Sequence, residues 1–312
     1  MRARLRGVLG LLALLAAPIA IAPWCARWHW SLDLLANFVV QAGWFLLLAA
    51  ALFAWQRAWR ALSACLAGAA VAGAAVLPDW FGATATVTAA PAASVRLLAL
   101  NLLRDNEANA ALALAGLADA APDIVLASEL TPEWHERLAP GLAAFPHRHV
   151  RTDPGYFGVG LWSRWPLRDA TIVSLGWSPA IRAVVDTPYG PIGVLGVHTP
   201  RPGNAARNAD RDQALAAIPK AVQGLPAAHV VLGDCNATPW TPTLRDLVAD
   251  GSLRAATFGS WLPSWPTMWP LPLRIPIDHA LLGPGLDALE VGTGPSFGSD
   301  HLPLFAVVQP RR

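Results

Sequence analysis

The chain has 312 residues, of which 54% are hydrophobic and only 14% are charged, and its formal net charge is +2. A mean hydropathy of +0.39, together with so few charges, excludes a protein that is soluble along its whole length. The near-neutral charge and the single lysine, Lys220, also exclude the polybasic footprint of a typical nucleic-acid-binding protein. The length leaves room for one large globular domain beside a membrane region.

The apolar residues are concentrated near the N-terminus. Three segments, 8–24, 32–55 and 58–77, have roughly the 20 apolar residues needed to cross the hydrocarbon core of a bilayer. A cleaved signal peptide explains the first segment almost as well, because arginines precede its apolar run, but it does not explain the other two. We therefore predict a transmembrane region of about three helices over residues 1–81.

The arginines beside these segments predict an orientation. The loop 25–33 holds one arginine, Arg27, and one acid, whereas five arginines lie before the first segment or between the second and third: Arg2, Arg4, Arg6, Arg57 and Arg60. By the positive-inside rule, the N-terminus and the second loop are cytoplasmic. An odd number of crossings then predicts a multi-pass protein of the cell (inner) membrane whose globular domain is extracytoplasmic.

The remainder of the chain is predicted to be a linker followed by an α/β domain. The small residues GATATVTAAPAAS are typical of a linker over 82–94. From Val95, the runs VRLLALNLL and DIVLASEL indicate buried strands, with a helix at 107–120 after the capping candidate Asn106. Many strands with few helices predict one mixed α/β domain over residues 95–312. Further strands are expected at 158–162, 183–186, 192–197, 229–232, 278–282 and 304–308, and further helices at 209–223 and 242–249.

The three cysteines predict no disulfide within the globular domain. Cys25 and Cys65 lie in or beside predicted membrane spans, and only Cys235 lies beyond them. Because Cys235 alternates with Asp234 and Asn236, it is expected to point to the opposite face of the strand end. We interpret it as a core thiol, since a nucleophilic cysteine needs a nearby base and an exposed position.

Polar side chains recur where the predicted strands begin or end. Each of them alone has an ordinary explanation as a turn former, a cap, a buried histidine or a strand-edge charge. Together they predict one site, because strand ends converge on one edge of a sheet and a hard divalent cation prefers carboxylate and carboxamide oxygens. The cysteines and histidines lack the ligand spacing of structural zinc. The set comprises Asn101, Glu129, His198, Asp234, Asn236, Asp278, Asp300 and His301.

Short motifs around these residues carry a family resemblance. Because these motifs follow one another in the family's order, residues 95–308 resemble the endonuclease/exonuclease/phosphatase superfamily. The three N-terminal spans ahead of such a domain resemble its membrane-anchored subgroup, which includes the VanJ teicoplanin-resistance protein and carries an expectation of antibiotic resistance. The motifs are LALNLL, PDIVLASE, GVGLWSRWPL, GVHTPRPG, GDCNATPW, IDHALL and GSDHLPL.

The resemblance implies a fold and an activity. The fold is a four-layered α/β-sandwich, in which two mixed sheets lie face to face and are flanked by helices. The activity is that of a Mg²⁺- or Mn²⁺-dependent phosphoesterase. Glu129 would be the main metal ligand, and Asn101 and Asp300 would complete or support the metal shell.

The resemblance also implies roles for the other polar residues. Asp234 would orient or deprotonate the attacking water, and Asn236 would hold a phosphate oxygen. His301, oriented by Asp278, would stabilise the developing charge or exchange the proton. His198 would contact the phosphate or protonate the leaving group. The resemblance does not assign the general base.

Three positions depart from the family pattern. Leu103 occupies a position where some members carry a second acid, so a second metal site is in doubt. Cys235 stands where an aromatic residue is common and His279 where a tyrosine is common. We interpret both as packing changes, with the alternative that His279 lines the cleft.

The substrate is predicted from the membrane anchor. A metal-dependent phosphoesterase tethered to the bilayer meets lipid-linked phosphates or pyrophosphates, which form the first prediction. An extracytoplasmic nuclease acting on DNA or RNA is the alternative, and an inactive binding module is disfavoured because every expected polar position is filled. The tryptophan-rich stretch FGSWLPSWPTMWPLPL at 258–273 either reaches into the headgroup region or is a proline-rich loop packed on the domain.

Overall fold

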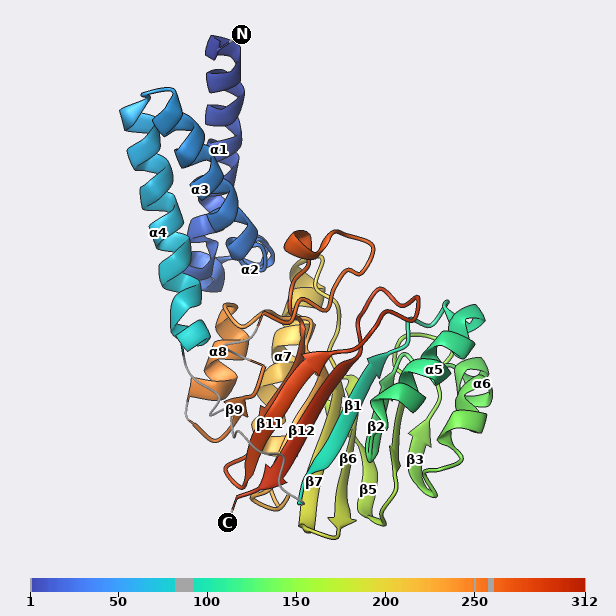
Figure 1. The fold of residues 1–312 in the computed structure, drawn as a ribbon. Helices are drawn as coiled ribbons and strands as arrows, with labels where there is room; N and C mark the ends of the chain where they lie inside the picture. Colours follow the sequence, from blue (N-terminus) through green and yellow to red (C-terminus); the bar gives the residue numbers. More distant parts are fainter. Residues whose placement is uncertain (1, 82–92, 250, 258–260, 312) are drawn as a thin grey trace.

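The structure of the protein is a computed structural model that describes residues 2–81, 93–249, 251–257 and 261–311. It consists of a helical N-terminal region and a domain built from two β-sheets (Figure 1). Most of the predicted linker, at residues 82–92, lies outside the described residues.

Three long helices form the N-terminal region. They are α1 (Arg2–Cys25), α3 (Val39–Trp55) and α4 (Trp59–Phe81). They pack side by side and extend away from the sheets, with the N-terminus at the far end (Figure 1). Small buried residues lie between them, such as Ala20, Ala49 and Ala75, and such residues let helix backbones approach closely in a membrane.

The second predicted span differs from the expectation. It is divided into α2 (Trp30–Ala36) and α3, which are bent by 62° relative to each other. At the break, the buried side-chain amide of Asn37 donates to the carbonyls of Asp33 and Leu34, and this bonding competes with a continuous helix. Among the residues that the structure describes, two helices, Gly7–Trp28 and Trp59–Leu77, are long and apolar enough to cross a membrane, or three if the bent pair forms one span.

The globular domain contains two six-stranded sheets. The first has the order β11-β12-β1-β2-β4-β3 and the second has the order β5-β6-β7-β8-β10-β9. Both are mixed, because β1–β2 and β7–β8 are parallel and the other described pairs are antiparallel. The strands are β1 (Val95–Asn101), β2 (Ile124–Ser128), β3 (His147–Arg151), β4 (Val159–Ser163), β5 (Leu167–Leu175), β6 (Ser178–Thr187), β7 (Gly190–His198), β8 (His229–Asp234), β9 (Arg254–Ala255), β10 (Asp278–Leu282), β11 (Leu286–Thr293) and β12 (Leu304–Pro310).

Three apolar clusters divide the domain into four layers. One lies between the sheets and includes Leu126 and Leu232. A second packs Leu117 and Trp134 of α5 (Ala110–Ala120) and α6 (Pro132–Leu142) on the first sheet. A third packs α7 (Ala205–Ala221) and α8 (Pro242–Ala249) on the second sheet. This arrangement confirms the predicted four-layered α/β-sandwich.

Several elements differ from the sequence prediction. The helix expected at 107–120 begins with a 3₁₀ turn, Glu107–Asn109. Helix α7 begins four residues before the expected 209, because the Asn204 side chain caps it by accepting from the Arg207 amide. The edge strands β3, β5 and β11 were not predicted, since they are half-exposed and carry charged residues instead of a continuous apolar run.

The N-terminal helices contact the domain at and around the loop that follows β8. Asn37 accepts a hydrogen bond from the Thr238 amide at 3.2 Å. Trp240 of the same loop packs in the apolar cluster of the N-terminal helices. Arg211 of α7 pairs with Asp33 of α2 at 2.7 Å, and both side chains are almost fully buried. The loop that starts at the end of β8 is thus held directly beneath α2.

Candidate active site

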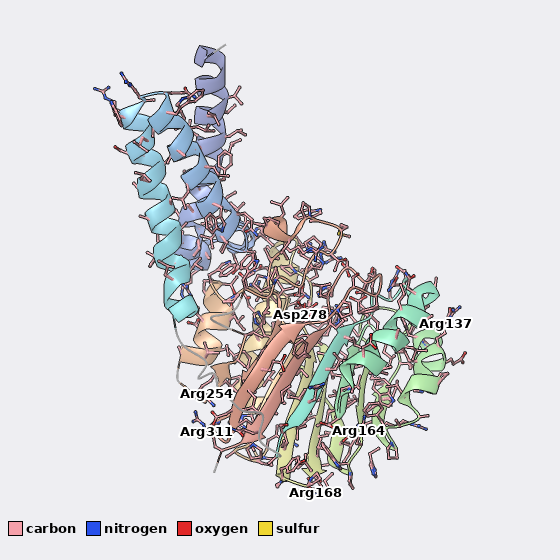
Figure 2. The ribbon with its side chains drawn as sticks, in the orientation of Figure 1. Arg137, Arg164, Arg168, Arg254, Asp278 and Arg311 are labelled. Atoms are coloured by element: carbon pink, nitrogen blue, oxygen red, sulfur yellow. The ribbon has the colours of Figure 1, made fainter. Side chains whose placement is uncertain are left out.

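The predicted polar residues meet at one edge of the two sheets. Asn101 ends β1, Glu129 directly follows β2, and His198 ends β7. Asp234 ends β8, opposite His198 in the parallel pairing and opposite Asp278 in the antiparallel pairing with β10. Figure 2 shows Asp278 at the edge of the sheets nearest the N-terminal helices.

Asp234 is at the centre of the site and is only 1% exposed. Its Oδ1 accepts from the Asn236 amide at 2.8 Å, and its Oδ2 accepts from Asn236 Nδ2 at 3.1 Å and Asn101 Nδ2 at 3.2 Å. Burial raises the pKa of Asp234 to about 6, against the opposing effect of the neighbouring histidines. Before it, Gly233 has a φ of +131°, and a Cβ there would collide with the Val197 carbonyl.

His301 and Asp278 form a buried pair beside Asp234. His301 Nδ1 donates to Asp278 Oδ2 at 2.8 Å, while its Nε2 lies 3.6 Å from Asp234 Oδ2. Burial by itself lowers the pKa of His301, but the charges of Asp278 and Asp234 outweigh burial and raise this pKa to about 10. In Asp278 the effect of burial is likewise outweighed by His301, which leaves the pKa of Asp278 below its ordinary value. The pair therefore supplies a cationic imidazolium of defined orientation at neutral pH.

His198 lies between the carboxylates of Glu129 and Asp234. Its Nε2 is 3.7 Å from Glu129 Oε1 and 3.7 Å from Asp234 Oδ2. Its Nδ1 donates to the Tyr156 carbonyl at 3.0 Å, so Nδ1 carries a proton, and Nε2 faces the carboxylates. The backbone of Glu129 is left-handed, with a φ of +55°, and its Oε2 accepts from the Arg104 amide at 3.1 Å. Such strained backbone is typical of functional sites.

Comparison with known proteins agrees with this geometry. Residues 98–301 match the Endonuclease/Exonuclease/phosphatase family. The chain belongs to this family. No curated protein matches the chain in sequence.

Solved structures of the Endonuclease/Exonuclease/phosphatase family share the fold. A family member from Beutenbergia cavernae is 20% identical, with a TM-score of 0.54 over 70% of this chain and 72% of that one. TDP2 of D. rerio, complexed with a single-strand DNA product, is 17% identical, with a TM-score of 0.56 over 69% and 99%. A family member from Bacteroides vulgatus is 15% identical, with a TM-score of 0.54 over 70% and 99%. The comparisons do not support the membrane-anchored subgroup or a part in antibiotic resistance.

Members of the Endonuclease/Exonuclease/phosphatase family are metal-dependent hydrolases, and the site contains oxygen ligands that fit a divalent cation. Asp234, Asp278 and His301 offer buried ligand atoms within 4.8 Å of one another. In His301, however, Nδ1 is engaged by Asp278, and a raised pKa leaves no free lone pair on the ring at neutral pH. The predicted ligands Glu129 and Asn101 supply a carboxylate and a carboxamide, which are oxygen donors of the kind that Mg²⁺ and Mn²⁺ prefer.

Asp300 lies apart from the hydrogen-bond network of Asp234. Its Oδ2 accepts from the indole Nε1 of Trp265 at 2.9 Å, and it is half-buried. It still contributes to the raised pKa of the neighbouring His301. Its assignment as a metal ligand stays a prediction.

The two packing interpretations agree with the structure. The Cys235 side chain lies in the cluster between the second sheet and its helices, where burial raises the pKa of the thiol well above its ordinary value. The His279 ring is fully buried and hydrogen-bonds Thr257 Oγ1 and the Ala237 carbonyl, each at 2.9 Å. Burial lowers the pKa of His279 to about 4, so this ring is neutral and packs behind the site.

The sequence prediction missed residues that hold the site in place. Ser299 Oγ donates to the Asn101 carbonyl at 2.7 Å and accepts from the His301 amide at 3.1 Å. The fully buried Arg211 donates to the Asn236 carbonyl at 3.3 Å. Ser299 lies within the GSDHLPL motif, which is a usable sequence signal. Arg211 lies on a helix whose sequence carries no sign that its side chain reaches the site.

Proposed function

We propose that the protein is a membrane-anchored, Mg²⁺- or Mn²⁺-dependent phosphoesterase whose substrate is a lipid-linked phosphate or pyrophosphate. The observation that carries the proposal is the direct contact between α2 and the loop that bears Asn236, through Asn37–Thr238 and Arg211. The edge of the two sheets that carries the site, here called the catalytic edge, adjoins the base of the apolar helices. This position favours a substrate whose phosphate lies at the bilayer surface. The membrane region is taken as residues 1–81 and the catalytic domain as 95–312.

The proposed roles divide the site into two halves. Glu129 would hold the cation, and Asn101 and Asp300 would complete or support its shell. A bound cation neutralises charge on the phosphate oxygens. Asp234 orients the attacking water and takes its proton. Asn236 would hold a phosphate oxygen through Nδ2, in exchange for one of its present bonds to the Thr199 carbonyl at 2.9 Å and Asp234 Oδ2 at 3.1 Å.

The two histidines complete the proposed reaction. The imidazolium of His301, held by Asp278, stabilises the charge that develops on the phosphate oxygens. His198 contacts the phosphate or protonates the leaving group, because its Nε2 points between Glu129 and Asp234. These assignments meet the two needs of attack on an anionic centre, which are neutralisation of charge and a base for water.

Surface charge favours the lipid over a nucleic acid. Arg164, Arg168, Arg254 and Arg311 lie away from the catalytic edge (Figure 2), and each is paired with a carboxylate. Arginines neutralised in this way do not form a track for a phosphate backbone. A nuclease remains the second candidate, because the similar TDP2 structure contains a single-strand DNA product.

We predict that salt distinguishes the two substrates. The purified full chain is incubated with Mg²⁺ or Mn²⁺ and a polyprenyl pyrophosphate, a phospholipid or DNA, and the released phosphate or cleaved strand is measured. Cleavage of the lipid-linked phosphate should change little between about 50 and 200 mM salt, whereas a nucleic acid held by many phosphate contacts would lose about a thousandfold in affinity. Efficient DNA cleavage with feeble lipid activity would reverse the ranking.

A further prediction concerns orientation. Residues 2–6 and the turn between α3 and α4 lie at the end of the helices opposite the sheets (Figure 1), and this end carries five arginines. We expect alkaline phosphatase fused after Arg312 to be active, because this reporter works only outside the cytoplasm. Green fluorescent protein fused at the same position should stay dark, because it is exported unfolded. The matched fusions at Arg57, between α3 and α4, should give the opposite pattern. An inactive phosphatase after Arg312 would place the catalytic edge in the cytoplasm.

A further inference from the structure

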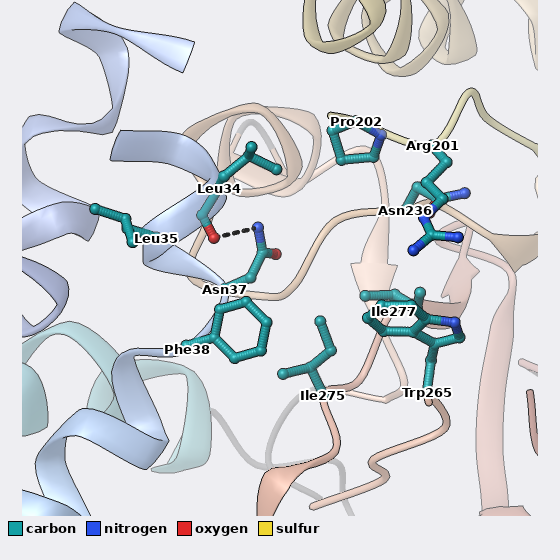
Figure 3. Close-up of a pocket in the computed structure, with 10 residues that line it drawn as sticks. All are labelled: Leu34, Leu35, Asn37, Phe38, Arg201, Pro202, Asn236, Trp265, Ile275 and Ile277. Carbon is teal, nitrogen blue, oxygen red and sulfur yellow. Dashed lines mark hydrogen bonds between the residues drawn. The ribbon is translucent and has the colours of Figure 1, made fainter. Parts of the chain in front are cut away.

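A cavity of about 280 Å³ lies between the N-terminal helices and the catalytic edge (Figure 3). One wall comes from α2 and the start of the next helix and includes Leu34, Leu35 and Phe38. The opposite wall includes Ile275 and Ile277, directly before Asp278. Its size is near the lower end of the roughly 300–1,000 Å³ typical of ligand pockets, and both walls are mainly apolar.

The polar end of this cavity belongs to the catalytic edge. Asn236 lines the cavity and also donates to Asp234 Oδ2 at 3.1 Å. Arg201 lies beside Asn236 (Figure 3), is exposed, and stacks its guanidinium over the Trp265 ring at 5.1 Å. The same indole donates to Asp300, the neighbour of His301. One end of the cavity therefore offers the guanidinium of Arg201 beside the carboxamide of Asn236, and the rest offers hydrocarbon.

We propose that this cavity binds the first part of the substrate's lipid chain, and that Arg201 binds the phosphate that joins the chain to the reacting group. The inference rests on the proposed function and adds where the lipid is recognised. Apolar walls gain from burying a hydrocarbon chain, and an arginine fork matches phosphate oxygens. Among the described residues, no carboxylate forms an ion pair with Arg201, so its charge is available to an anion. The α2 wall places the chain at the base of the helices that are proposed to cross the bilayer.

The test compares two pyrophosphates that share a headgroup and differ in chain length, dimethylallyl and farnesyl pyrophosphate. The full chain in lipid nanodiscs is expected to have a kcat/KM for the farnesyl compound at least about tenfold higher, since each buried methylene contributes about fourfold. Leu34→Trp fills the cavity and should bring this ratio close to one. Phe38→Trp is a second filling variant in case the first does not insert or fold. Leu112→Trp, at an exposed position of α5, is the matched control and should keep the wild-type ratio.

A binding measurement separates this inference from the proposed function. Calorimetric titration of the Asp234→Asn variant with both pyrophosphates reports chain recognition without hydrolysis. Farnesyl affinity that is lowered by adding Leu34→Trp supports the cavity even if the wild type hydrolyses neither compound, in which case only the proposed reaction fails. Hydrolysis of both compounds with a chain-length ratio unchanged in correctly folded Leu34→Trp and Phe38→Trp would overturn the cavity assignment alone.

Discussion

Asp234→Asn and Glu129→Gln are each expected to lower kcat/KM for a phosphate ester by at least about a hundredfold while leaving the fold intact. Asp234 is hydrogen-bonded by Asn101 and Asn236, and it is proposed to take the proton of the attacking water. Glu129 is the main proposed ligand of the cation. Loss of a general base or of a metal ligand removes stabilisation that exists mainly in the transition state. Steady-state hydrolysis at saturating Mg²⁺ measures the loss.

The controls for this experiment address folding and charge. Asp186→Asn removes a carboxylate that pairs with Arg168 at the surface, and it should retain nearly full activity. Circular dichroism and the melting temperature should show that the two site variants are folded. If Asp234→Asn or Glu129→Gln turned over substrate at close to the wild-type rate, the proposed division of roles would be wrong.

Arg211→Met is expected to reduce the free energy of unfolding by about 3–5 kcal/mol, the usual cost of breaking a buried ion pair. Arg211 is fully buried and joins Asp33 of α2, at 2.7 Å, to Asp212 and to the Asn236 carbonyl. Removing the guanidinium leaves the Asp33 carboxylate buried without its partner. Chemical denaturation in a mild detergent, followed by tryptophan fluorescence, measures the change.

Two further variants identify the cause of that loss. The double variant Asp33→Leu/Arg211→Met removes both charges and should recover most of the stability. Arg27→Gln breaks the exposed pair with Asp246 at the same interface, and it should cost less than about 1 kcal/mol. An Arg211→Met protein as stable as Arg27→Gln would mean that the buried pair does not hold α2 on the domain.

The sequence predicts the central strands and the site residues on them for one physical reason. A strand buried on both faces needs a continuous apolar run, so the polar residue that ends the run is conspicuous, as with Asn101 and Asp234. Half-exposed edge strands such as β5 lack that contrast and are missed. Helix α6 was not predicted, although its Thr131-Pro132 start is the same kind of signal that predicted α8.

The sequence by itself determined the apolar N-terminal region, the α/β domain and the polar strand ends, because hydrophobic periodicity and local turn chemistry are properties of neighbouring residues. Only the tertiary structure decided how Asp33 and Arg211, 178 residues apart, bring α2 onto the loop of Asn236. It also decided the bend at Asn37 and the cavity beside Arg201. Such features depend on which surfaces meet, and a pairing between distant residues leaves no periodic pattern along the chain.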